Sequence, residues 1–300
     1  MSVLLVQPVQ ASIAAVSTEL REWLENMVWY HHFSDEEIAA ATGYALEDIQ
    51  RFRAQFDIHV NNRPRRPEGS PLLVLPYPGG RHPRIQFLEG AVRPQRETKF
   101  SVFAPWDETA YAVVDLPEAI WSNLGLTYLA HTHVPTLWTK QNVTLERREW
   151  QRGEGGRLSG ERTLPNGIRF AARVHPGRDA VRMELELTNG TPEPLTDLRV
   201  QICVMLKGLT QFEQLTNDNK VFETPYIACR DATGKRWILT AWEPCHRTWA
   251  NPPCPCLHSD PRFPDCGPGE TRKLRGWLSF YEGTEIRSEI QRVEQLGWRK

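Results

Sequence analysis

The stretch IRFAARVHPGRDAVRMELELT, residues 168–188, determines the fold class of this chain. Apolar residues occupy every second position in 168–174 and again in 181–187, with arginine or glutamate between many of them. This period of two is typical of antiparallel strands that have one face in a core and the other in solvent. The following Thr-Asn-Gly-Thr-Pro-Glu-Pro, residues 188–194, predicts a turn.

The same alternation continues on both sides of this stretch. It returns in residues 198–206 and 274–280, and about a dozen such runs lie between residues 71 and 282 with little helix between them. We therefore predict a mainly β protein with a large antiparallel β-sandwich. Ile286, Ile290 and Val293 share one face of a helix that closes the chain.

The N-terminal part has helical spacing instead and predicts a small three-helix segment, whose first helix contains Leu20, Trp23, Leu24, Met27 and Val28. Ser34 and Glu37 form the pattern of a capping box, and Gly43 ends the helix that follows. A further helix is expected from about Ala45 to Phe56, so the segment resembles a helix-turn-helix. Residues 18–57 contain nine acidic and three basic side chains, a net charge of −6 that would repel phosphates. We expect a helical cap or a homodimer contact and no nucleic-acid partner.

The chain therefore divides into a helical segment, 1–60, a linker, 61–70, and a β-sandwich domain with a C-terminal helix, 71–300. Composition agrees with a globular protein: 40% of the 300 residues are hydrophobic and 24% are charged, with 36 basic and 37 acidic side chains. No secretory signal or membrane span is apparent. We expect a cytoplasmic protein whose six cysteines are free thiols.

His131 and His133 form the sharpest local motif, since two residues two apart on a strand point to one face. Both imidazoles could then reach one divalent metal, Zn, Fe or Mn. The spacing from Gly125 resembles the first half of the cupin metal motif. The cupin carboxylate is missing, because Trp138 and Thr139 stand where it is expected.

A second candidate is the proline-rich stretch from Cys254 to Cys266, which contains Cys256, His258 and Asp260. Three interpretations remain open: a structural zinc site, a proline-stiffened loop carrying functional His258 and Asp260, and a plain surface loop with free thiols. The cysteine spacing does not match a Cys-x2-Cys pair.

A third candidate is the polar stretch from Gln211 to Lys220, where Glu213, Asn217 and Asp218 offer acid, base and hydrogen-bonding groups. A polar turn is the alternative. Trp106 and Trp121 lie next to carboxylates and amides, a combination common in sugar sites, although core positions are the alternative. No glycine-rich phosphate loop or Gly-x-Ser-x-Gly is present, which disfavours nucleotide cofactors and α/β-hydrolase chemistry.

Residues 71–290 resemble the galactose mutarotase-like β-supersandwich proteins. The resemblance rests on the strands at 180–189 and 194–206 and on the closing Arg-Gly-Trp-Leu-Ser-Phe-Tyr-Glu-Gly, 275–283. It implies a concave sheet face that carries a carbohydrate-active site. Sugar epimerases, polysaccharide lyases and glycoside hydrolase domains share this fold.

These observations lead to a hypothesis of a carbohydrate-active enzyme of epimerase or lyase type, acting by proton transfer on a sugar or oligosaccharide. His131 and His133 would bind a divalent metal or the substrate. His258, Glu213 or Asp260 would complete the metal shell or act as acid and base. A cupin-like metal-dependent oxygenase and a non-catalytic sugar-binding or regulatory protein are the alternatives.

Overall fold

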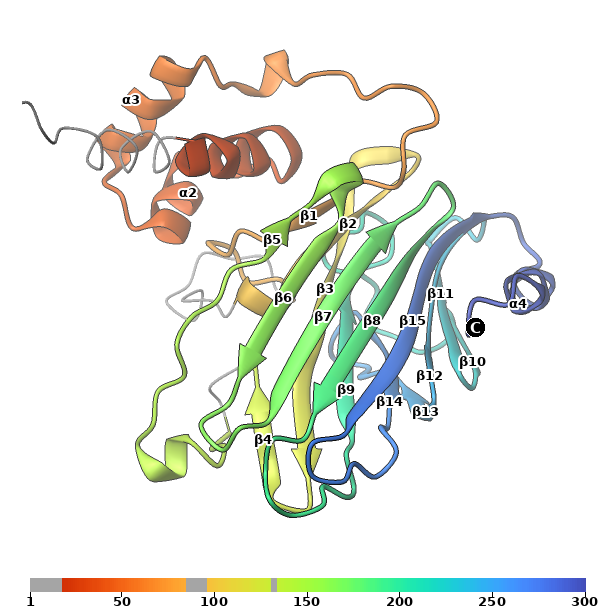
Figure 1. Ribbon diagram of the computed structural model, residues 1–300. Helices are drawn as coiled ribbons and strands as arrows, with labels where there is room; N and C mark the ends of the chain where they lie inside the picture. Colours follow the sequence, from red (N-terminus) through yellow and green to blue (C-terminus); the bar gives the residue numbers. More distant parts are fainter. Residues whose placement is uncertain (1–17, 85–95, 131–133) are drawn as a thin grey trace, which may run out of the picture. The chain divides into compact units, whose positions relative to one another are not determined.

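The computed structural model describes residues 18–84, 96–130 and 134–300 (Figure 1). Contacts divide the chain into two compact units. The first contains the helical segment up to Pro67 together with Pro78–His82. The second contains Glu68–Tyr77 and nearly all of the chain from Pro94 to Lys300. The boundaries expected from the sequence, 1–60, 61–70 and 71–300, stand as a proposal.

The helical unit is described from residue 18, where the chain is already helical. The elements that follow in its described residues are the π-helical turn η1 (Asn26–Tyr30), the helices α2 (Asp35–Thr42) and α3 (Leu46–Phe56), and the short 3-10 turn η2 (Val60–Asn62).

The start and end of α2 follow from its sequence. The Ser34 side chain accepts a hydrogen bond from the Glu37 backbone, and the Glu37 carboxylate accepts one from the Ser34 backbone. Gly43 ends the helix in the left-handed conformation, which glycine adopts without strain. Arg81 forms two hydrogen bonds to Glu37, at 2.7 and 2.8 Å, and so ties the later segment to this helix.

The second unit consists of two antiparallel sheets (Figure 1). The seven-stranded sheet contains β1 (Val74–Pro76), β2 (Lys99–Ala104), β3 (Asp107–Ser122), β9 (Val200–Met205), β14 (Cys256–Pro261) and β13 (Cys245–Trp249) in that order, with β4 (Gly125–Leu129) paired to β3. The eight-stranded sheet runs β10 (Lys220–Glu223), β11 (Tyr226–Arg230), β12 (Arg236–Glu243), β15 (Thr271–Glu282), β8 (Ala180–Thr188), β7 (Arg169–Pro176), β6 (Leu158–Thr163) and β5 (Gln151–Arg152).

Among its described residues, the second unit also contains the short 3-10 turns η4 (Arg96–Thr98), η5 (Thr139–Gln141) and η6 (Glu154–Gly156) and the helix α4 (Ile286–Gln295). The α4 helix matches the closing helix expected from Ile286, Ile290 and Val293. These three residues pack against the outer face of the eight-stranded sheet in a cluster with Trp237 and Trp277.

The main core lies between the two sheets. Alternate residues of each strand contribute to it, for example Val204 of β9, Leu257 of β14 and Leu185 of β8, all with at most 1% exposure. Residues one position away point to the opposite face of their sheet. The prediction of a mainly β, large antiparallel β-sandwich with an N-terminal helical segment is confirmed. None of the helices in the described ranges is both long and apolar enough to cross a membrane.

A close approach between two central strands fixes part of this core. Trp242 of β12 pairs with Gly276 of β15, and its indole is fully buried. A Cβ atom on Gly276 would lie 2.5 Å from Trp242 Cε2, well inside contact distance. Glycine at this position therefore gives the indole the room it occupies.

The variant Gly276→Ala is expected to destabilise the chain by about 1–3 kcal/mol, because the added methyl group overpacks the site against Trp242. Urea unfolding of the full chain measures the change. Gly153→Ala is the control, because its Cβ would lie 3.6 Å from Arg157, an ordinary contact. A Gly276→Ala variant as stable as Gly153→Ala would contradict this packing argument.

His31 makes the helical unit sensitive to acid. Burial, together with the charges of Arg81 and His32, lowers the pKa of His31 to about 3 despite its hydrogen bond to the Asn26 carbonyl. The unfolded chain binds a proton near pH 6.5 and the folded chain does not. The contribution of His31 to stability is therefore full above pH 6.5 and is lost as the pH falls from 6.5 toward 3.

Amide hydrogen exchange in α2 and α3 is expected to show this loss as the pH is lowered from 7 to 4, after correction for the intrinsic exchange rate. His31→Leu removes the titrating group, so its stability should change less over this range. His59→Gln is the control, because that side chain is 52% exposed and should leave the wild-type profile intact. Identical profiles for wild type and His31→Leu would exclude His31 as the cause.

Candidate active site

The outer face of the seven-stranded sheet carries a row of buried polar side chains. We call Lys99, Asp115, Cys203, His258 and Trp249 the polar row. Taken as whole residues, the first four are at most 3% exposed, and Trp249 is half-buried. Polar groups are rarely excluded from water unless they are paired or used. This row is therefore the candidate site.

Strand register builds the polar row across five neighbouring strands. Lys99 of β2 lies opposite Asp115 of β3, and Asp115 lies opposite Cys203 of β9. The register of β9 with β14 pairs Leu257 with Val204, so the next step places His258 opposite Cys203. His258 in turn lies opposite Trp249 of β13. With strands about 4.8 Å apart, the row is about 19 Å long.

A buried ion pair forms one end of the row. Lys99 Nζ lies 2.8 Å from Asp115 Oδ2, and the two side chains are 4% and 0% exposed. Such a pair is costly to break, because the remaining charge stays in a region without water. It also holds positive and negative groups at fixed positions on the sheet face.

Asp260 organises the other end. Its carboxylate accepts hydrogen bonds from the Ile202 backbone at 3.1 Å, Arg247 Nε at 3.0 Å and Trp249 Nε1 at 2.6 Å. Oδ1 lies 3.7 Å from His258 Nδ1. The His258 ring stacks on Trp249 with centroids 3.9 Å apart. Three donors thus fix the carboxylate, and the stacked indole fixes the imidazole that faces it.

The electrostatics of the row follow from burial and from these neighbours. Burial lowers the pKa of His258, but interactions with Asp260 and the Cys256 sulfur outweigh it and raise the pKa to about 10. For Cys203, an interaction with Cys256 lowers the thiol pKa, while burial and the charges of Glu118 and Asp115 raise it to about 11. Without a bound cation, the Cys203 sulfur is therefore a neutral thiol at neutral pH.

Glu118 reaches the same face through an irregularity in β3. The register of β3 with β9 shifts between Asp115 and Ala119, and Glu118 lies within the shift. Such bulges redirect side chains and are frequent next to active sites. The Glu118 side chain accepts a 2.8 Å hydrogen bond from Gln201 Nε2, and its charge acts on the Cys203 thiol. The carboxylate therefore lies beside the polar row.

Of the residues singled out in the sequence, His258 and Asp260 are brought together here. The proline-rich stretch is not the loop that two of the interpretations assumed, because residues 256–261 form the buried strand β14. One proline precedes this strand and another ends it, and at these positions neither interrupts the backbone hydrogen bonds between the central residues of the paired strands. Cys266 lies elsewhere, in an isolated bridge with Leu195.

Glu213, Asn217 and Asp218 lie in the loop between β9 and β10. One Glu213 carboxylate oxygen and the Asn217 side-chain oxygen are buried without a hydrogen-bond partner among the described residues. Trp106 is close to this loop, because its ring stacks on Phe212 with centroids 6.4 Å apart. The loop and Trp106 therefore form a separate group of predicted residues.

Trp121 lies at the far end of β3, where the Arg199 guanidinium sits 5.9 Å from its ring centroid. His131 and His133 lie outside the described residues, so their expected metal-binding role stays a prediction.

The sequence did not single out Lys99, Asp115 or Cys203. Cys203 stands between Ile202 and Val204 in a mostly apolar strand, and 53 positions separate it from Cys256. The sequence signal that could have placed Cys203 on the outer face is the alternation of core-facing and outward-facing residues along its strand. Once Val204 faces the core, Cys203 must face the other side.

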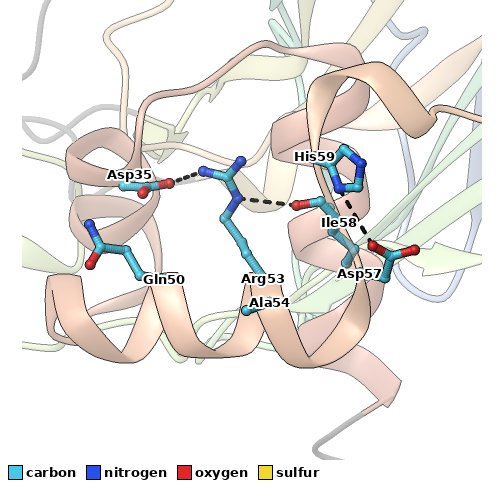
Figure 2. Close-up of a pocket in the computed structure, with 7 residues that line it drawn as sticks. All are labelled: Asp35, Gln50, Arg53, Ala54, Asp57, Ile58 and His59. Carbon is cyan, nitrogen blue, oxygen red and sulfur yellow. Dashed lines mark hydrogen bonds and ion pairs between the residues drawn. The ribbon is translucent and has the colours of Figure 1, made fainter.

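A hollow of about 260 Å³ lies in the helical unit. In Figure 2, Arg53 of α3 points to Asp35 of α2 and to the Ile58 carbonyl, while His59 points to Asp57. Arg53 is thus occupied in joining the two helices, and we assign this hollow no chemical role.

No protein-family model and no curated protein sequence matches this chain. Solved structures do match. A structure assigned as an aldose 1-epimerase from Escherichia coli K12 is 13% identical with a TM-score of 0.35, covering 45% of this chain and 69% of that one. The Slr1438 protein from Synechocystis sp. PCC 6803 is 11% identical with a TM-score of 0.36, covering 63% and 90%.

The heparan sulfate lyase HepC from Pedobacter heparinus is 10% identical with a TM-score of 0.36, covering 84% of this chain and 43% of its own length. The structural neighbours thus include sugar-acting enzymes, among them the aldose 1-epimerase expected from the mutarotase-like resemblance. Because each TM-score lies below 0.5, the proposals below rest on residues of this chain.

The ion pair at the end of the row yields a prediction for stability. Lys99→Met leaves Asp115 buried without its cation and is expected to cost about 3–5 kcal/mol. The double variant Lys99→Met/Asp115→Leu removes both charges and should recover much of that loss. A double-mutant cycle by urea unfolding measures the coupling. Additive effects of the two single variants would contradict a direct interaction.

Proposed function

We propose that this chain is a carbohydrate-active enzyme that transfers a proton at a sugar carbon, as in epimerisation or β-elimination. The observation that supports the proposal is the polar row, a set of fixed charges and hydrogen-bonding groups on the outer face of the seven-stranded sheet. Water exclusion strengthens the electrostatic effect of such groups on a reacting molecule.

Glu118 is the proposed base. The Gln201 amide fixes its carboxylate at 2.8 Å, and the bulge in β3 directs it beside the row. A carboxylate held in this way can remove the proton from a carbon next to a carbonyl or carboxylate group. The cations Lys99 and Arg247 on the same face would offset the negative charge that develops on the substrate oxygen.

Sugar recognition would come from the Trp249 end of the row. A half-buried indole offers a flat apolar surface to the apolar face of a sugar ring. The Gln201 amide and the Arg247 guanidinium lie beside the polar row. They could donate hydrogen bonds to the hydroxyl or acidic groups of the sugar. Asp260 is proposed as a positioning residue, because its carboxylate is already held by three donors.

The remaining sequence-based roles stay proposals that rest on the sequence pattern. They comprise acid–base chemistry by Glu213 or His258, substrate binding by Trp106, Trp121, Asn217 and Asp218, and metal binding by His131 and His133. A cytoplasmic location and a homodimer are proposals of the same kind.

The test is solvent exchange at carbon. The purified chain is incubated in D2O with neutral aldoses and with uronic acid oligosaccharides, and deuterium incorporation and unsaturated products are followed by NMR. Turnover of one class is expected. Glu118→Gln should reduce its rate by about 10²–10⁴-fold, the usual effect of losing a general base.

Glu184→Gln on β8 is the matched control, because this carboxylate lies on the outer face of the other sheet and is 42% exposed. It should keep the wild-type rate. Sugar binding without exchange or elimination would indicate a binding protein and overturn the proposal, as would full activity of Glu118→Gln.

A further inference from the structure

Two cysteines and one histidine meet at the centre of the polar row. The ligand atoms of Cys203, Cys256 and His258 all lie within 4.8 Å of one another. Each residue is at most 3% exposed, and both cysteines are free thiols. We propose that Cys203, Cys256 and His258 bind one zinc-class divalent cation.

The fold explains why these three side chains converge. Cys256 and His258 are two apart on β14 and therefore point to the same face of the sheet. On the neighbouring strand, Cys203 lies opposite His258 and diagonal to Cys256, as the pairing of Cys256 with Met205 requires. Two adjacent strands thus supply three ligands without any loop.

The spacing suits a tetrahedral metal. Zinc–sulfur bonds of about 2.3 Å place neighbouring ligand atoms about 3.8 Å apart in a tetrahedral site. Since the three atoms lie within 4.8 Å, shifts of about 1 Å or less would complete the arrangement. Thiolate and imidazole ligands together favour zinc over calcium or magnesium.

A second, independent observation is the surroundings of His258. Its Nδ1 atom is buried, has no hydrogen-bond partner among the residues that the structure describes, and lies 3.7 Å from Asp260 Oδ1. Histidines that bind metals commonly direct their second nitrogen to a carboxylate that is itself hydrogen-bonded. Asp260 meets that description, because the Ile202 backbone and Trp249 Nε1 bind it.

The three protein ligands leave the fourth tetrahedral position for water or substrate, as in catalytic zinc sites. This chemical use rests on the proposed function, because the cation would lie beside Glu118 and could attract a substrate oxygen there. Metal binding itself can be tested without any sugar.

The experiment uses the full chain, reduced and treated with a chelator. Zinc chloride is then added, and bound metal is measured by mass spectrometry after gel filtration. One equivalent per chain is expected. Cobalt added in place of zinc should give the thiolate-to-cobalt charge-transfer band, which needs no variant to interpret.

The variants locate the site. Cys203→Ser, Cys256→Ser and His258→Gln should each weaken zinc binding by more than about 100-fold, and Asp260→Asn by about 10–100-fold. Cys229→Ser is the matched control, because Cys229 is a fully buried cysteine on β11 and lies outside the cluster. It should retain one equivalent.

Two outcomes overturn the inference: wild-type chain that takes up no zinc and shows no cobalt band, or Cys229→Ser that loses metal as the cluster variants do. No metal uptake, together with a Cys203–Cys256 cross-link found by peptide mass spectrometry of the unreduced protein, would assign these two residues to a disulfide instead. Zinc binding without deuterium exchange would overturn only the proposed function. Exchange by a chain that binds no zinc would overturn only this inference.

Discussion

The register between β9 and β14 is the constraint on which the candidate site depends. Val204 and Leu257 face the core as a pair, and this leaves Cys203 and His258 together on the opposite face. A shift by one residue would bring the polar side chains into the core and the apolar ones out of it. The hydrophobic core therefore determines the geometry of the candidate site, although none of its atoms belongs to the polar row.

Asp260 connects this register to the neighbouring strand. Its carboxylate accepts from the Ile202 backbone on β9 and from the side chains of Arg247 and Trp249 on β13. A single buried anion thus fixes three strands and the imidazole that faces it. Fixed dipoles of this kind cost no reorganisation when a substrate arrives.

The fold could be predicted because alternation is a local property. Residues 168–188 identify their strands without knowledge of any partner, and Ser34, Glu37 and Gly43 identify both ends of α2. The site could be predicted only in part. His258 and Asp260 could be predicted as site residues because both are polar and close in sequence. The stretch that contains them, however, could equally be interpreted as a loop. Its outward side chains are polar and still buried, so the usual contrast between apolar and polar positions is absent.

The pairing of Cys203 with His258 joins two strands that are distant in sequence, and no local pattern contains that information. Lys99 and Asp115 lie on the consecutive strands β2 and β3, but the sequence pattern does not show that both side chains are buried. The charge balance of the face connects them with the proposed metal. A divalent cation with two thiolates and a neutral imidazole adds no net charge to the buried row. Metal binding would therefore not add an uncompensated charge to the Lys99–Asp115 and Arg247–Asp260 pairs already present. The desolvation cost that normally opposes a buried cation is offset by its own ligands, which is why a row of this composition can hold one at the centre of a sheet.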